Sequence, residues 1–232
     1  MKKNINGKLY GIGVGPGDPE LITLKAMKFM KNAEVIACPA KDGEPGVAYG
    51  IAQKVYPNIT DKECLLLNFP MEKTEWEIAH KSAAEKIINE LSTGKDVAML
   101  TLGDTGFFST FFYVAEIVKD KGFEVEIING IPSFCAIFAK LKIPACLGDE
   151  PVLITAGEYR DFEGTLIIMK AGRMLKTIKE KLIKEKLIKE KLAGSKRQIY
   201  LVENCGMEDE KVYEGLDAIP DKAGYFSVLI IK

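Results

Sequence analysis

Short apolar runs alternate with amphipathic stretches along the first half of the chain. Runs rich in aliphatic residues predict strands over residues 9–14, 34–37, 64–67, 97–102 and 124–128. Segments whose apolar positions recur every three or four residues predict helices over 21–31, 47–55, 76–91 and 108–121. This alternation predicts a mainly parallel sheet whose strands are joined by helical crossovers.

The pattern restarts after the segment Asn-Gly-Ile-Pro at residues 129–132. A helix is predicted over 133–141, followed by strands over 152–156, 165–169, 198–202 and 225–231. We therefore predict an α/β fold of two α/β domains, residues 1–128 and 129–232, with a ligand cleft between them.

The pentad Ile-Lys-Glu-Lys-Leu occurs three times in tandem over residues 178–192. These residues favour helix, but an advance of five residues rotates successive apolar pairs by about 140°, so the pairs cannot form one stripe. We expect part of this helix to expose its apolar pairs or to pack on a partner. A lengthened surface helix and a partner-binding helix both remain open.

Composition excludes several classes of function. The chain has 232 residues, 47% of them hydrophobic, which suffices for a full core. A net charge of -1 and only three arginines give no electrostatic footprint for nucleic acid. No stretch is apolar for the length a bilayer needs and no apolar signal core follows the N-terminus, so a cytoplasmic protein without a membrane partner is expected.

The number and spacing of the cysteine and histidine residues limit the metal sites that the chain can form. The five cysteines form no C-x-x-C pair, and His80 is the only histidine. Neither a disulfide framework nor a zinc site is indicated, and no protein-bound metal is expected. We expect His80 to face solvent, because charged and polar residues surround it in the sequence.

Two glycine-bearing turns follow predicted strands, over residues 11–19 and 101–106. The first resembles a dinucleotide-binding loop, but Pro16 offers no amide hydrogen to a phosphate. Asp18 is expected to be the N-cap of the following helix, with Pro19 and Glu20 in its first turn, so the positive helix end is already compensated. The glycines instead suit close backbone approach to a nucleoside or a flat macrocycle.

Longer segments resemble a known family. Residues 7–26 (Gly-Lys-Leu-Tyr-Gly-Ile-Gly-Val-Gly-Pro-Gly-Asp-Pro-Glu-Leu-Ile-Thr-Leu-Lys-Ala) resemble the opening signature of the tetrapyrrole methylases, S-adenosylmethionine-dependent enzymes of corrin and siroheme synthesis. Residues 68–71 (Asn-Phe-Pro-Met) with Trp76, residues 101–104 and 108–110, and residues 225–230 (Tyr-Phe-Ser-Val-Leu-Ile) resemble the branch that methylates C20 of precorrin-2 or its cobalt form.

The resemblance implies the cofactor, the architecture and the partners. S-adenosylmethionine would be the methyl donor, held between two domains of a homodimeric enzyme, and the partner would be a small-molecule tetrapyrrole. The cofactor-binding positions carried over from the family are Pro16, Leu102, Gly103, Asp104, Phe107, Pro132, Ser133, Met169 and Cys205. The sequence departs from the usual family pattern at Thr105, where a proline is commoner, and over residues 129–133.

Asp104 is the predicted catalytic residue. Methylation of a meso carbon ends with loss of a proton, so a carboxylate beside the cleft could act as the base or could stabilise positive charge. The alternative is a turn aspartate that accepts hydrogen bonds from its own backbone between Gly103 and Gly106.

A polycarboxylate substrate calls for cations and aromatic surface. Lys41, Lys170 and Arg173 are the candidate cations, although each could be an ordinary solvated surface charge. The candidate aromatic residues are Tyr10, Trp76, Phe107, Phe108, Phe111, Phe112 and Tyr113. For most residues of the aromatic segment over 107–113, filling a core is the favoured interpretation.

The resemblance thus implies methylation of C20 of cobalt-precorrin-2 in cobalamin biosynthesis. Metal-free precorrin-2 is the nearest alternative substrate. A diphthamide-precursor or ribosomal RNA methylase of the same fold is more remote, and a nucleotide-binding module without catalysis is permitted by the first glycine turn alone.

Overall fold

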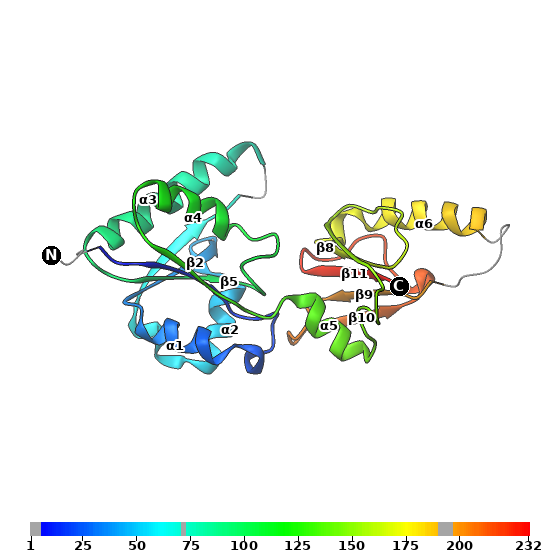
Figure 1. Ribbon diagram of the computed structural model, residues 1–232, viewed down its shortest axis with the longest axis horizontal. Helices are drawn as coiled ribbons and strands as arrows, with labels where there is room; N and C mark the ends of the chain where they lie inside the picture. Colours follow the sequence, from blue (N-terminus) through cyan, green and yellow to red (C-terminus); the bar gives the residue numbers. More distant parts are fainter. Residues whose placement is uncertain (1–5, 71–72, 190–196) are drawn as a thin grey trace. The chain divides into compact units, whose positions relative to one another are not determined.

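The computed structural model describes residues 6–70, 73–189 and 197–232 (Figure 1). Its contacts divide the chain into two compact units, Met1–Pro132 and Ser133–Lys232. Met71 of the 68–71 segment and residues 190–192 of the pentad repeat lie outside the described residues. Among the helices of the described part, none is long and apolar enough to cross a membrane.

The sheet of the first unit is mainly parallel, as predicted. Its strands are β1 (Leu9–Gly13), β2 (Val35–Lys41), β3 (Glu44–Pro45), β4 (Glu63–Asn68), β5 (Val97–Thr101) and β6 (Val125–Ile128). The main path runs β2-β5-β1-β6, β4 lies parallel on the outer side of β2, and the short β3 pairs antiparallel with the end of β2. The carboxyl ends of β1, β5 and β6 therefore meet at one edge.

Two helices cover each face of this sheet (Figure 1). These are α1 (Leu24–Asn32) and α2 (Val47–Val55) on one face and α3 (Trp76–Ser92) and α4 (Phe111–Asp120) on the other. Both faces are buried because alternate strand residues point to opposite sides: Ile36 packs toward α1 and α2, whereas Val35 packs toward α3 and α4.

The first helix begins three residues later than predicted. Asp18 caps a short 3-10 turn, η1 (Pro19–Leu21), by accepting from the Glu20 N–H at 2.9 Å. Thr23 is the N-cap of α1, and its Oγ1 accepts from the Ala26 N–H at 3.1 Å. Asp18 is thus an N-cap with Pro19 and Glu20 in the first turn, as predicted, but it caps η1 and not α1.

The second unit has a mixed sheet. Its strands are β7 (Val152–Ala156), β8 (Thr165–Met169), β9 (Ile199–Glu203), β10 (Lys211–Glu214) and β11 (Ser227–Ile231), in the order β10-β9-β11-β8-β7. Among these described strands, only β7 and β8 pair in parallel. The α5 helix (Ser133–Leu141) packs on one face and α6 (Leu175–Lys189) on the other. Two further 3-10 turns lie in this unit, η4 (Gly172–Met174) and η5 (Leu216–Ala218), and two lie in the first unit, η2 (Pro57–Asp61) and η3 (Lys73–Glu75).

The pentad repeat forms the outer part of α6. Leu175, Ile178 and Leu182 are buried against the second sheet, at the spacing of one helix face. The next apolar residue, Ile183, is 45% exposed, because the five-residue advance rotates it away from that face. The expected exposure of part of the apolar repeat is thus observed at Ile183.

His80 lies in an aromatic cluster between α3 and α4, not at the surface. Its ring stacks on Tyr113 with centroids 4.7 Å apart and an interplanar angle of 2°, and Phe69 and Trp76 flank it at 5.9 and 6.2 Å. His80 is 7% exposed. The expectation of a solvent-facing histidine was wrong, because Tyr113, whose ring stacks on His80, lies on another helix and meets it only in the fold. Burial lowers the pKa of His80 below its ordinary 6.5, so its ring is neutral at pH 7.

This burial predicts a pH dependence of stability. As the pH drops, His80 takes up a proton near its ordinary pKa in the unfolded chain, but only at lower pH in the folded protein. The unfolding free energy therefore has its full value above pH ~6.5 and decreases as the pH drops below it. The variant His80→Phe keeps a stacked ring without a titrating group and should lose that part of the slope. Urea unfolding followed by the fluorescence of Trp76 measures both; parallel pH profiles for the two proteins would contradict the assignment.

Candidate active site

Two loops join beyond the carboxyl ends of β1 and β5. The Gly15 N–H donates to the Gly103 carbonyl at 3.1 Å, and the Gly103 N–H donates to the Gly15 carbonyl at 2.7 Å. This pair is an isolated antiparallel bridge between the two glycine turns identified in the sequence. Gly103 adopts φ of 75°, a backbone conformation that glycine takes without strain.

A third glycine loop, after β6, packs directly on these two. A Cβ built on Gly130 would lie 2.0 Å from the Gly103 carbonyl oxygen, and one built on Gly13 would lie 2.5 Å from the Gly130 nitrogen. Side chains are excluded at these positions because backbone touches backbone. The sequence interpretation assigned the glycines to close approach of a ligand; the structure shows that their first role is close approach of the three loops. We call the contact of Gly13, Gly103 and Gly130 the glycine crossing.

The Asp104 carboxylate joins two of these loops. Its Oδ1 accepts from the Gly106 N–H at 2.7 Å, and its Oδ2 accepts from the Gly130 N–H at 2.9 Å. The first bond is the one expected of a turn aspartate; the second crosses to the loop after β6 and was not predicted. The side chain is 9% exposed, so each bond replaces water that the carboxylate has lost.

The other predicted cofactor residues of the first unit lie around this crossing. Pro16 is buried in the turn after β1, and Leu102 is half-buried directly after β5. Phe107 is 38% exposed, and its N–H donates to the Asp104 carbonyl at 3.4 Å. Pro132 is half-buried and ends the first unit.

Thr105 occupies the position where the family pattern has proline. It is fully buried, and its Oγ1 has no hydrogen-bond partner within the described part of the chain. Its carbonyl accepts from the Ser109 hydroxyl at 2.9 Å, and that hydroxyl oxygen accepts from the Phe111 N–H at 3.2 Å. The loop between β5 and α4 is therefore fixed by its own side chains.

The three predicted residues of the second unit lie at the ends of its elements. Met169 is the last residue of β8, Cys205 follows β9, and Ser133 begins α5. The strands β8 and β9 run in the same direction on either side of β11, where Val228 is paired with Met169 on one side and with Val202 on the other. Met169 and Cys205 consequently share one edge of the second sheet.

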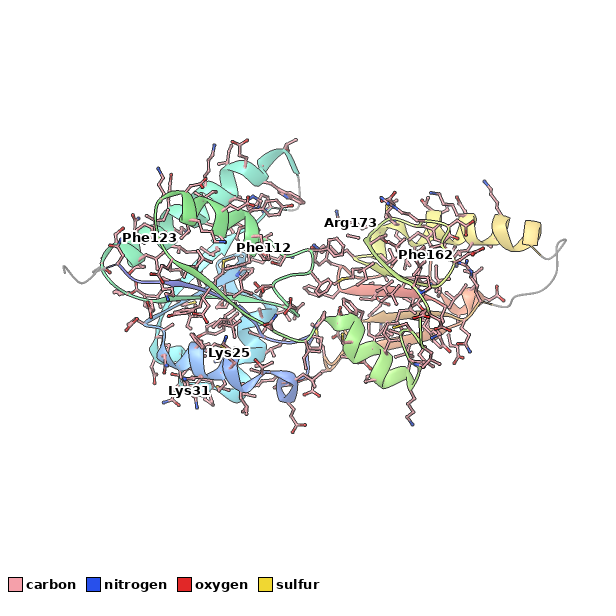
Figure 2. All side chains as sticks on the ribbon, viewed as in Figure 1. Lys25, Lys31, Phe112, Phe123, Phe162 and Arg173 are labelled. Carbon is pink, nitrogen blue, oxygen red and sulfur yellow. The ribbon has the colours of Figure 1, made fainter. Side chains whose placement is uncertain are left out.

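The candidate cations are divided between the units. Lys41 is exposed and ends β2 of the first unit. Lys170 and Arg173 both follow β8 in the second unit, where Arg173 is exposed (Figure 2).

An open parallel sheet with glycine loops at its strand ends is typical of enzymes that bind nucleosides or nucleotides. The sequence model of the tetrapyrrole (corrin/porphyrin) methylases matches residues 8–218, and the chain belongs to this family. It is 38% identical to a protein of Methanocaldococcus jannaschii named "Probable cobalt-precorrin-2 C(20)-methyltransferase", over 97% of this chain and 96% of that protein. It is 28% identical to a precorrin-2 C(20)-methyltransferase of Sinorhizobium, over 97% of this chain and 95% of that protein.

Solved structures share the fold. The uroporphyrin-III C-methyltransferase of Thermus thermophilus, in complex with S-adenosylhomocysteine, superposes with a TM-score of 0.70 over 97% of this chain and 92% of that chain, at 19% identity. This likeness confirms the predicted fold class.

The glycine crossing predicts a large difference between two glycine substitutions. Gly130→Ala places a Cβ 2.0 Å from the Gly103 carbonyl oxygen, so the loops must separate, and unfolding free energy should fall by about 2 kcal/mol or more. Gly50→Ala is the matched control: Gly50 lies in α2 with no atom within 4 Å of an added Cβ, and alanine there should stabilise by about 0.5–1 kcal/mol. Equal effects in urea unfolding would contradict the crossing.

The variant Asp104→Asn tests the carboxylate bridge. An asparagine has one oxygen, so either the Gly106 or the Gly130 N–H loses its acceptor, and unfolding free energy should fall by about 1–3 kcal/mol. Denaturant unfolding and methyl-transfer kinetics are measured on the same preparation. Unchanged stability together with lost turnover would assign Asp104 to chemistry alone.

Proposed function

We propose that this chain is an S-adenosylmethionine-dependent methyltransferase that methylates C20 of cobalt-precorrin-2 in cobalamin biosynthesis. The observation that carries the proposal is the 38% identity, over nearly the whole length of both chains, to a relative named for that reaction. The cobalt form is preferred because the relative that is 38% identical is named for cobalt-precorrin-2, whereas the relative named for precorrin-2 is 28% identical. No comparable support favours a diphthamide or ribosomal RNA methylase.

When bound, S-adenosylmethionine supplies an electrophilic methyl group: the sulfur–carbon bond breaks as the bond to C20 forms, S-adenosylhomocysteine is released, and C20 loses a proton. The protein then has three tasks, namely to align the two reactants, to exclude water and to accept the proton.

The residues at the first sheet's edge fit this donor. Leu102 and the partly exposed Phe107 offer apolar surface for an adenine ring, and the loop backbone offers carbonyl and amide groups for the ribose and amino-acid parts. The Asp104 carboxylate supplies negative charge for a sulfonium.

The residue assignments are proposals of the same kind. We infer that Pro16, Leu102, Gly103, Asp104, Phe107 and Pro132 contribute from the first unit, and Ser133, Met169 and Cys205 from the second. Asp104 stays the predicted base, with its two backbone bonds holding it in place. The homodimeric state, the cytoplasmic location and the division at residue 128 likewise remain predictions.

The direct test is an anaerobic incubation with S-adenosylmethionine and, in parallel, cobalt-precorrin-2 and metal-free precorrin-2, with mass spectrometry of each tetrapyrrole. We expect a single added methyl group on the cobalt form, located at C20 by NMR. Methylation of the metal-free form alone would transfer the proposal to that substrate, and methylation of neither would contradict it.

A further inference from the structure

Cationic and aromatic side chains meet in the second unit, where the half-buried Lys170 follows β8 and Tyr225 and Phe226 precede β11. The Lys170 Nζ lies 5.5 Å from the ring centroid of Tyr225, and the Tyr225 and Phe226 rings meet edge to face with centroids 5.3 Å apart. Tyr225 is 44% exposed and Phe226 37%, and Arg173 is exposed two residues after Ala171 (Figure 2). We call Lys170, Arg173, Tyr225 and Phe226 the Lys170 surface.

The backbone beneath the Lys170 surface is tightly built. A Cβ on Gly172 would lie 2.2 Å from the Gly224 carbonyl oxygen, so the turn after β8 touches the segment that precedes β11. The Ala223 N–H donates to the Gly172 carbonyl at 3.2 Å, and the Ala171 N–H donates to the Ser227 carbonyl at 3.1 Å. Two segments more than 50 residues apart in the chain are thus locked together, and they carry the cations and the rings respectively.

A buried carboxylate anchors the same segment. Glu203 is 8% exposed, and its two oxygens accept from the Gly224 N–H at 2.8 Å and from the Tyr213 hydroxyl at 3.0 Å. The acceptance from Gly224 fixes the backbone immediately before Tyr225. Because Glu203 lies below the surface with both oxygens engaged, the surface itself presents cations and rings.

The backbone at Lys170 is in an unfavourable conformation. Its φ is 56°, a left-handed region that glycine or asparagine adopts more readily than lysine. Such residues concentrate at functional sites, where the surrounding structure holds them in place. In this conformation the Lys170 Nζ lies over the Tyr225 ring.

The chemistry of this surface matches a flat polyanion. Exposed aromatic rings stack on a conjugated macrocycle, and lysine and arginine form charge-assisted hydrogen bonds with peripheral carboxylates. Resting on the proposed function, we propose that the Lys170 surface binds the tetrapyrrole substrate, with Tyr225 and Phe226 against the macrocycle and with Lys170 and Arg173 on its carboxylates. The site would then select planar polycarboxylates.

Two substitutions separate the cation from the ring. Lys170→Gln removes the charge, Tyr225→Leu removes the ring, and Lys170→Arg keeps the charge. Lys142→Gln is the control, because Lys142 is an exposed lysine of the second unit in the same left-handed conformation as the half-buried Lys170, with φ of 57°. Thermal melting of each variant verifies folding.

The readouts are absorbance titration with uroporphyrin III as a stable planar polycarboxylate, KM for cobalt-precorrin-2, and calorimetric binding of S-adenosylhomocysteine. Lys170→Gln and Tyr225→Leu should each weaken tetrapyrrole binding about tenfold while S-adenosylhomocysteine binding stays unchanged, and Lys170→Arg should recover most of the loss. Lys142→Gln should match the parent chain.

Three results would overturn the proposal: uroporphyrin binding equal in all variants, equal loss of both ligands, or a shift from dimer to monomer in sedimentation with tetrapyrrole binding intact. The last would assign the surface to contact with a second copy of the chain. Failure of the C20 assignment is seen separately, as absence of methyl transfer by the unsubstituted protein, and the uroporphyrin titration still decides the role of the surface.

Discussion

The Asp104 carboxylate, with the glycine crossing beside it, is the constraint on which the candidate site of the first unit depends. One oxygen closes the turn after β5 and the other holds the loop after β6, while Gly15 and Gly103 join the turn after β1. The loops after β1, β5 and β6 are thereby joined to one another at one edge of the sheet. A ligand that binds there meets backbone groups already in place, so less ordering free energy is lost on binding.

This arrangement is compatible with both interpretations of Asp104, as a turn aspartate and as a catalytic carboxylate. A carboxylate with two backbone donors is held in a single orientation, which is what a base or a charge-stabilising group requires. The second unit uses the same device at Glu203, where a buried carboxylate fixes the backbone before Tyr225. In each unit, a buried acidic side chain near the end of a strand accepts hydrogen bonds that fix the backbone of a loop.

Much of the fold could be predicted from the sequence because both sheets are buried on two faces. Apolar strand residues such as Val35 and Ile36 then form continuous runs that are readily identified. The β10 strand was missed because its residues are mostly exposed at the sheet's outer edge and carry little apolar signal. The boundary at Thr23 was missed because two competing caps, Asp18 and Thr23, lie five residues apart, and only the three-dimensional turn decides between them.

The candidate site was predicted in part. The glycine turns and Asp104 stand out in the sequence, but the bond from Asp104 to Gly130 spans 26 residues and has no local signal. The burial of His80 depends on Tyr113 of another helix, and the position of Lys170 over Tyr225 depends on the contact of Gly172 with Gly224. Composition and periodicity identify which residues are suited to chemistry; tertiary contacts decide which of them meet.

The most direct test of the account is amide hydrogen exchange with and without S-adenosylhomocysteine, read by mass spectrometry. If the joined loops form the donor site, the peptides that contain Gly103, Gly106 and Gly130 should exchange more slowly when the ligand is bound, whereas the peptide that contains Gly50 in α2 should not change. Saturating ligand binding by calorimetry with no change in exchange over residues 103–106 and 129–130 would contradict the central claim.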